Sequence, residues 1–202
     1  CKAKVISLDY RKCPEVSFPQ PINDCFNLWS YIQSNAKKFG IDSSRVALAG
    51  DSAGGLISLT LSIELKKQEK KPAAICVAYP WVTTSMENQN SLETCADTFP
   101  LNRKTVDRQT VFPNDFNIEH EWANPLLRDD LIDLPPMIIA TAGFDPIRDQ
   151  GNKFALKMKE NGNTIRHLFF KNLCHSFLML GRVSKEVDSA NLKIASELKS
   201  FL

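Results

Sequence analysis

Short apolar runs alternate along the chain with longer stretches in which apolar residues recur at helical spacing. The runs predict strands at residues 5–8, 45–49, 73–79, 137–141 and 164–170. The helical spacing predicts helices over residues 21–38, from Leu56 to Leu65, over residues 146–161 and over residues 184–202. Continuous apolar strands separated by helices predict an α/β protein, in which helices cover both faces of a mostly parallel sheet.

Residues 82–130 interrupt this alternation. The segment contains Pro100, Pro113 and Pro125 and only short helical patterns, and it is too long for a simple loop. It begins and ends at the carboxyl edge of the predicted sheet, where α/β proteins place their sites. We therefore interpret residues 1–202 as a single domain that carries residues 82–130 as a lid insertion.

The composition is that of an ordinary globular protein. Of the 202 residues, 43% are hydrophobic and 24% are charged, which excludes a disordered chain and a coiled coil. A net charge of +2 without clusters of one sign predicts no nucleic-acid partner, and no apolar run is long enough to span a bilayer.

Six cysteines are spread singly along the chain, without any C-x-x-C pair: Cys1, Cys13, Cys25, Cys76, Cys95 and Cys174. This spacing argues against a zinc knuckle or a redox motif. A chain of this length can fold without disulfide bonds or a structural metal, so we expect reduced structural thiols. The spacing of the cysteines also permits a disulfide.

A G-x-S-x-G sequence centred on Ser52 follows one predicted strand directly and opens a helix. The flanking residues are Gly50, Asp51, Ala53, Gly54 and Gly55. This context is typical of a nucleophile elbow, in which the serine adopts a strained conformation and glycines two residues away on either side avoid clashes. The new helix directs free N–H groups toward charge that forms near Ser52, and Ala53 N–H is the candidate oxyanion donor. A glycine-lined turn that binds phosphate fits the same spacing, but such loops usually add a lysine and none is near.

A serine hydroxyl needs a base, and the chain has three histidines. His120 lies in the insertion, and His167 lies inside a predicted strand. His175 follows the last predicted strand, at the same edge of the sheet as Ser52. Position therefore favours His175 as the base.

The base needs a carboxylate, and two lie near the carboxyl end of the strand at residues 137–141. Asp145 precedes Pro146, a pair that is also typical of a helix start, and Asp149 lies one turn later. The chain order Ser52, Asp145, His175 is the order of α/β-hydrolases. This order favours Asp145 and leaves Asp149 as the alternative.

With these motifs the chain resembles the hormone-sensitive-lipase-like carboxylesterases, the family that includes arylacetamide deacetylase and the gibberellin receptors. The matching segments extend nearly from end to end: D-Y-R-x-x-P-E-x-x-F-P at residues 9–19, G-D-S-A-G-G at 50–55, N-P-L-L at 124–127, L-P-P at 134–136 and G-F-D-P-I-R-D at 143–149. The resemblance implies an α/β-hydrolase fold with Asp145 as the triad acid. The segment His175-Ser176-Phe177 has Ser176 where the family's usual H-G-F has glycine. This departure leaves the histidine base in place.

Two departures concern the first part of the chain. No glycine precedes Gly40 and no His-Gly pair occurs, so the family's H-G-G-G oxyanion loop is absent. The family also places a further strand between those predicted at residues 5–8 and 45–49, so we expect a gap in the sheet. We expect the native protein to extend beyond Cys1; its compartment stays open, with the cytoplasm favoured.

These residues predict a carboxylic ester hydrolase that acts through an acyl-enzyme on short- to medium-chain or aryl esters. A small-molecule ester is then the expected partner. The reaction needs no cofactor and no metal, and the oligomeric state stays open. One alternative is a non-catalytic receptor on the same fold, although the gibberellin receptors lack the triad histidine that is present here as His175. The other alternative is an inactive, N-terminally truncated fragment.

Overall fold

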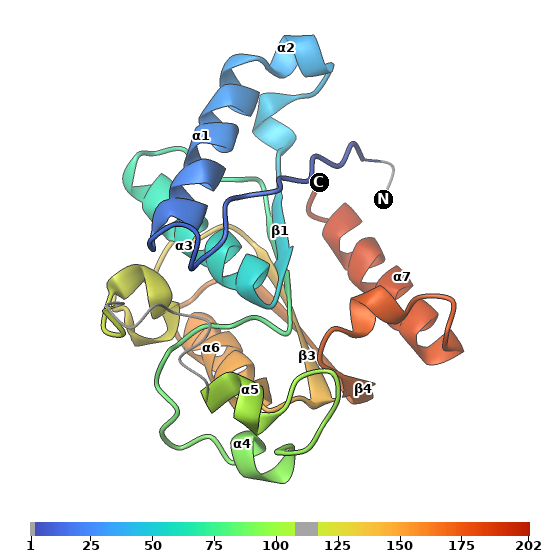
Figure 1. Cartoon of the computed structure of the whole chain (residues 1–202). Helices are drawn as coiled ribbons and strands as arrows, with labels where there is room; N and C mark the ends of the chain where they lie inside the picture. Colours follow the sequence, from blue (N-terminus) through green and yellow to red (C-terminus); the bar gives the residue numbers. More distant parts are fainter. Residues whose placement is uncertain (1–2, 108–116) are drawn as a thin grey trace.

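The fold is built on a four-stranded parallel sheet (Figure 1). A computed structural model of the chain describes residues 3–107 and 117–202, so Cys1, Pro113 and part of the insertion lie outside it. The strands lie in chain order: β1 (Leu48–Asp51), β2 (Ile75–Ala78), β3 (Met137–Phe144) and β4 (Ile165–Cys174). Leu48, Ile75, Met137 and Ile165 are in register, so the strands begin level. Because the strands are parallel, their carboxyl ends lie at the same end of the sheet, which is its carboxyl edge.

The helices follow the predicted pattern. In chain order they are α1 (Gln20–Ser34), α2 (Ala36–Phe39), α3 (Ala53–Lys67), α4 (Ser91–Thr94), α5 (Arg103–Asp107), α6 (Arg148–Glu160) and α7 (Lys185–Lys199). The predicted helix at residues 21–38 is divided at Asn35 into α1 and α2. Within the described ranges, none of the helices has the length and hydrophobicity that a membrane span requires.

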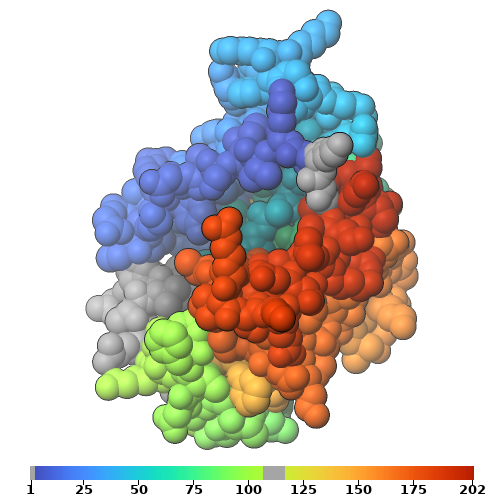
Figure 2. All heavy atoms as spheres, turned by 90° about the vertical axis from the view of Figure 1, so that its right-hand side faces the viewer, coloured from blue at the N-terminus to red at the C-terminus, as the bar shows by residue number. Residues whose placement is uncertain are grey.

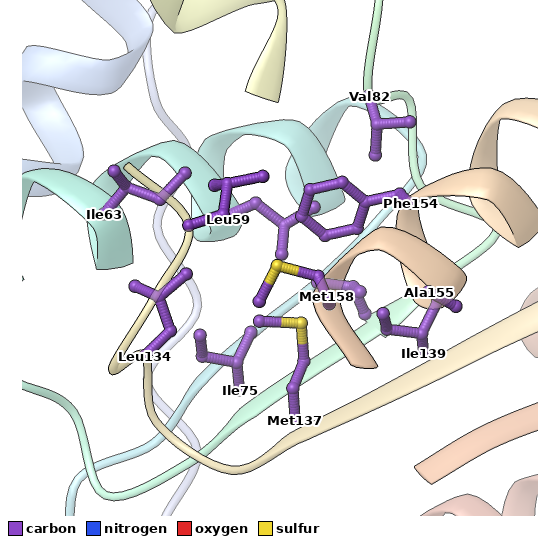
Figure 3. Close-up of a cluster of buried hydrophobic side chains, with 12 residues drawn as sticks. Leu59, Ile63, Ile75, Val82, Leu134, Met137, Ile139, Phe154, Ala155 and Met158 are labelled. Atoms are coloured by element: carbon purple, nitrogen blue, oxygen red, sulfur yellow. The ribbon is translucent and has the colours of Figure 1, made fainter. Parts of the chain in front are cut away.

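Helices cover both faces of the sheet, as the sequence predicts. On one face, α3 and α6 pack on β2 and β3 through the cluster in Figure 3, which includes Leu59, Val77, Met137 and Phe154. On the other face, α7 packs on the same strands through a second cluster that includes Ala78 and Ile194. Because both faces of β2 and β3 are buried, both strands are continuous apolar runs. The α/β class is confirmed.

The strand predicted at residues 5–8 is wrong. Residues 3–8 pair with none of the described strands, and Val5 is 88% exposed. They line a groove of about 920 Å³ whose other walls include β1, α1 and the end of α7. Figure 2 shows this hollow between the N-terminal segment and α7. An apolar run forms a strand only with a neighbour within hydrogen-bonding distance, and the groove separates this one from β1.

β1 is therefore an edge strand. Leu48 N–H and Ser52 N–H donate toward β2, so the alternation along a strand directs the backbone groups of Ala49 and Asp51 into the groove. Both of these residues are exposed, although the run around them is as apolar as that of a central strand. The groove lies where the family resemblance predicts a gap in the sheet.

The described parts of the insertion contact two regions of the core. α4 lies beside the carboxyl end of β3, where Cys95 Sγ at the end of α4 donates to the Gly143 carbonyl at 3.6 Å (Figure 1). Val106 of α5 packs with Leu56 and Ile147. Residues 117–130 pack on α3, where Thr60 Oγ1 donates to the Trp122 carbonyl at 2.8 Å and Arg128 Nη1 lies 2.7 Å from Glu64 Oε1.

The five described cysteines (Cys13, Cys25, Cys76, Cys95 and Cys174) are free thiols in this structure, and Cys1 lies outside the described residues. Burial raises the pKa of the Cys76 thiol to about 11, so Cys76 behaves as a small apolar side chain.

Candidate active site

Ser52 lies on the sharp turn between β1 and α3. Its φ of 51° and ψ of −115° are unfavourable for a side chain other than glycine, with a cost on the order of 1–3 kcal/mol. Two hydrogen bonds hold the turn: Ser52 N–H donates to the Ala78 carbonyl at 3.0 Å, and Trp81 N–H donates to the Ser52 carbonyl at 3.1 Å. The end of β2 therefore holds the strained serine, which stays half-buried and accessible.

The glycines around Ser52 have different roles. A Cβ on Gly50 would lie 2.2 Å from the Gly54 carbonyl oxygen, and a Cβ on Gly55 would lie 2.8 Å from Pro80 Cβ. A Cβ on Gly54 would meet no atom within 4 Å. The expectation that both flanking glycines avoid clashes is correct for Gly50 and wrong for Gly54, because Gly54 already faces open space at the start of α3.

The imidazole of His175 joins the serine to a carboxylate. His175 Nε2 lies 3.0 Å from Ser52 Oγ, and His175 Nδ1 lies 2.8 Å from Asp145 Oδ2. A carboxylate only accepts hydrogen bonds, so Nδ1 carries the proton of the neutral ring and Nε2 is the free acceptor for the Ser52 hydroxyl. His175 is 4% exposed, and its N–H donates to the Phe144 carbonyl at 3.2 Å.

Asp145 uses both carboxylate oxygens. While Oδ2 faces the imidazole, Oδ1 accepts from Ile147 N–H at 2.9 Å, and the residue is fully buried. The turn that begins α6 thus fixes the carboxylate plane. Asp145 itself is not the cap of α6, since Ile147 occupies that position.

Asp149, the alternative acid, points elsewhere. Ser91 N–H donates to Asp149 Oδ2 at 2.8 Å, and Asp149 N–H donates to Ser91 Oγ at 3.1 Å. Ser91 Oγ also donates to the Pro146 carbonyl at 2.8 Å. Asp149 therefore ties α4 of the insertion to the loop that carries Asp145.

The two other histidines lie outside this chain of hydrogen bonds. His120 Nδ1 accepts from Trp122 N–H at 3.1 Å, and its ring contacts Phe18. His167 Nε2 lies 2.8 Å from Thr141 Oγ1, and burial lowers the pKa of His167. Both have local structural partners.

Tyr79 is the residue near the site that sequence reasoning missed. The sequence predicts Tyr79 only as the last residue of a strand, but the centroid of its ring lies 4.7 Å from the centroid of the His175 ring. Nothing in its spacing signals this contact, because Tyr79 and His175 are distant in sequence.

Ala53 is the first residue of α3, and the first N–H groups of a helix have no partner within it. Its N–H is thus available beside Ser52. Trp81, which follows β2, is 9% exposed and packs in a core cluster with Leu56 and Ile147. Phe99, in the insertion, is 83% exposed. In the described part of the chain, His, Cys, Asp and Glu side chains form no group of three that is suited to a metal ion.

A serine, an imidazole and a buried carboxylate in one hydrogen-bonded chain, at the carboxyl edge of a parallel sheet, form the arrangement typical of α/β-type serine hydrolases. The family model described as the alpha/beta hydrolase fold matches residues 1–179, and the chain belongs to this family. This family match and the esterase relatives described next confirm the resemblance to the hormone-sensitive-lipase-like carboxylesterases.

An arylesterase of Saccharolobus solfataricus is 31% identical over 189 residues, which cover 93% of this chain and 62% of the relative. The carboxylesterase NlhH of Mycobacterium tuberculosis is 30% identical over 208 residues, which cover the whole chain and 65% of the relative. The crystal structure of EstE1, a thermostable carboxylesterase from a metagenomic library, is 29% identical with a TM-score of 0.89 and covers 96% of this chain and 67% of its own. The chain thus spans less than two thirds of the length of the arylesterase and of NlhH.

Proposed function

We propose that this protein hydrolyses carboxylic esters of small molecules, with Ser52 as the nucleophile, His175 as the general base and Asp145 as the acid that orients it. The observation that carries the proposal is the unbroken path from Ser52 Oγ through the imidazole to Asp145 Oδ2, with contacts of 3.0 and 2.8 Å. Relatives named arylesterase and carboxylesterase support the same reaction.

In the first half of the reaction, His175 Nε2 takes the proton of Ser52 Oγ as the oxygen bonds to the ester carbonyl carbon. The tetrahedral intermediate then expels the alcohol, which takes the proton back from the imidazolium. In the second half, water gives its proton to the same imidazole and attacks the acyl-enzyme. The acid leaves, and Ser52 regains its hydroxyl.

The oxyanion of each tetrahedral intermediate lies next to Ser52, where Ala53 N–H is the donor at the start of α3. The sequence contains no H-G-G-G segment to add further donors. One missing donor lowers the rate by about 10²–10³-fold. Covalent labelling of the serine is therefore a necessary companion to measurements of turnover.

The insertion at residues 82–130 belongs to the single hydrolase domain and acts as its lid in this proposal. Support comes from α4, which is bonded through Ser91 to the loop that carries Asp145. A lid at this edge would select the acyl chain, and we propose short- to medium-chain or aryl esters as the substrate class.

The test is turnover of p-nitrophenyl acetate and butyrate by the protein and by its Ser52→Ala variant, with labelling by a fluorophosphonate probe. We expect turnover and labelling that both vanish in Ser52→Ala. Equal turnover by the two proteins would overturn the assignment. Failure of the probe to label Ser52, together with tight reversible binding of an ester, would favour a receptor.

A further inference from the structure

Tyr79 lies between the turn that carries Ser52 and the loop that carries His175. It follows β2 at the carboxyl edge of the sheet and is 1% exposed. Its ring meets the His175 ring at 4.7 Å with an angle of 56° between the planes, and it meets the Phe177 ring edge-on at 5.2 Å. One buried aromatic side chain thus covers the base.

The backbone of Tyr79 is strained in the same way as that of Ser52. Its φ is 36°, a region that an aromatic residue rarely adopts. Tyr79 N–H donates to the Ala140 carbonyl at 2.6 Å. The neighbouring Ala78 and Trp81 are the residues whose backbone groups bond to Ser52. Strain that is kept next to a site by several hydrogen bonds is typical of a functional constraint.

The hydroxyl of Tyr79 takes little part in bonding. It is buried near Asp51 and the backbone of Leu178, and it forms no hydrogen bond of ordinary geometry with the described residues. Burial, followed by the negative charge of Asp51, raises the pKa of Tyr79, so the phenol stays neutral. The aromatic ring is therefore the part of the side chain through which Tyr79 acts.

We propose that Tyr79 is a positioning residue for the base: its ring holds the imidazole of His175 in the plane that joins Ser52 Oγ to Asp145 Oδ2. This inference rests on the proposed function and extends it to a residue that touches neither the ester nor the reacting oxygen. The ring of Tyr79 acts on His175, and the backbone groups of its neighbours Ala78 and Trp81 hold Ser52, from which His175 takes the proton.

The hydrogen bond from Nδ1 to Asp145 fixes one edge of the imidazole and leaves the ring free to tilt about that bond. A second aromatic ring against its face removes this freedom. Aromatic pairs contribute about 0.5–1.5 kcal/mol beyond their burial, which corresponds to roughly a two- to tenfold change in the population of the aligned ring. The effect falls on kcat, because substrate binding does not involve Tyr79.

Two substitutions separate the ring from the hydroxyl. Tyr79→Phe keeps the ring and removes the hydroxyl, and Tyr79→Leu removes the ring. Phe154→Leu is the matched control, because it removes a fully buried ring from the cluster on the opposite face of the sheet. The measurements are kcat and KM for p-nitrophenyl butyrate, the urea midpoint, and the downfield proton NMR signal of the His175 Nδ1–H.

We expect Tyr79→Leu to lower kcat about tenfold with KM within twofold of wild type, and Tyr79→Phe to stay within twofold in both. Phe154→Leu should lower the urea midpoint without changing kcat. The Nδ1–H signal should persist in Tyr79→Phe and broaden away in Tyr79→Leu.

Wild-type kcat in Tyr79→Leu would overturn the inference, and so would an equal loss in Tyr79→Phe or in Phe154→Leu. If Ser52→Ala shows that wild type has no serine-dependent turnover, the proposed function fails and the NMR signal alone decides: its persistence in Tyr79→Leu overturns the role of Tyr79, and its loss supports it. If Tyr79→Leu does not fold, Tyr79→Phe decides, since full activity there supports the ring and a tenfold loss overturns it.

Discussion

β1 and β3 carry Ser52 and Asp145 to the same edge of the sheet, but the molecule supports the two strands very differently. β3 lies between β2 and β4 with helices on both faces, and it is buried from Met137 to Gly143. Among the described strands, β1 pairs with β2 alone, and it exposes Ala49 and Asp51 to the groove.

The difference shows where the geometry of each residue comes from. A closed core holds Asp145, and both of its carboxylate oxygens have partners. Ser52 depends instead on its own turn: the close approach of Gly50 to Gly54, the bonds to Ala78 and Trp81, and the anchoring of α3 by the insertion. Substitutions in the two regions should therefore act in different ways, on rate in one and on stability in the other.

The largest expected effect tests Asp145, which follows the buried strand β3. Asp145→Asn should lower kcat by about 10⁴-fold, because an amide that donates to Nδ1 stabilises the wrong tautomer of His175. Asp149→Asn is the matched control and should stay within about tenfold of wild type, since an amide oxygen still accepts from Ser91 N–H. Steady-state kinetics on p-nitrophenyl butyrate measures both. A loss in Asp149→Asn as large as that in Asp145→Asn would return Asp149 to the role of acid.

A smaller effect tests the turn that carries Ser52, which follows the edge strand β1. Gly50→Ala should destabilise the fold by about 3 kcal/mol, because the new Cβ would lie 2.2 Å from the Gly54 carbonyl oxygen. Gly54→Ala should leave stability unchanged or raise it by about 0.5 kcal/mol, because its Cβ enters open space at the start of a helix. Urea unfolding measures both changes. Equal midpoints for the two variants would show that the turn adapts and that the contrast between the strands is weaker than described.

The smallest effect concerns the contact between the insertion and α3. Arg128 bridges Glu64 of α3 and Asp130, and the guanidinium lowers the pKa of Asp130 from its ordinary 3.8 to about 2. A pKa that is lowered in the folded state stabilises the protein above about pH 4, and this contribution is lost as the pH falls toward about 2.

Asp130 is 39% exposed, so solvent screening limits its contribution to about 1 kcal/mol or less. Asp130→Asn should therefore be slightly less stable than wild type at pH 7, and the difference should shrink between pH 4 and pH 2. Urea midpoints of the two proteins across this range measure it. A difference in urea midpoint that does not depend on pH would show that the ion pair between Arg128 and Asp130 does not cause the loss of stability.

The strands β2 and β3 could be predicted because burial on both faces makes them continuous apolar runs. β1 and β4 are only partly buried, and their apolar residues alone predicted them. The turn at Ser52 could be predicted because strand, glycines and helix follow one another locally. The strand at residues 5–8 was predicted wrongly, since its formation depends on a neighbour across the groove and not on Val5 or Ile6 themselves. Position at the sheet edge was sufficient to select His175 from three histidines.

Other features depend on contacts between distant segments, which a single sequence does not report. Asp149 looked like a second acid until its partner proved to be Ser91, 58 residues away. Gly54 has the same spacing from Ser52 as Gly50, but only Gly50 is in a crowded place. Tyr79 carried no signal at all, because its contact with His175 exists only after β2 and β4 have entered one sheet.

The sequence by itself determined the α/β class, the carboxyl-edge location of the candidate site and the identities of Ser52, Asp145 and His175 as its candidates. These follow from local periodicity, local turn chemistry and chain order. The tertiary structure alone decided which oxygen of Asp145 faces the imidazole, which ring covers that imidazole, and that the strand of Ser52 borders an open groove. Those outcomes depend on distances between segments, and such distances are set only when the whole core packs.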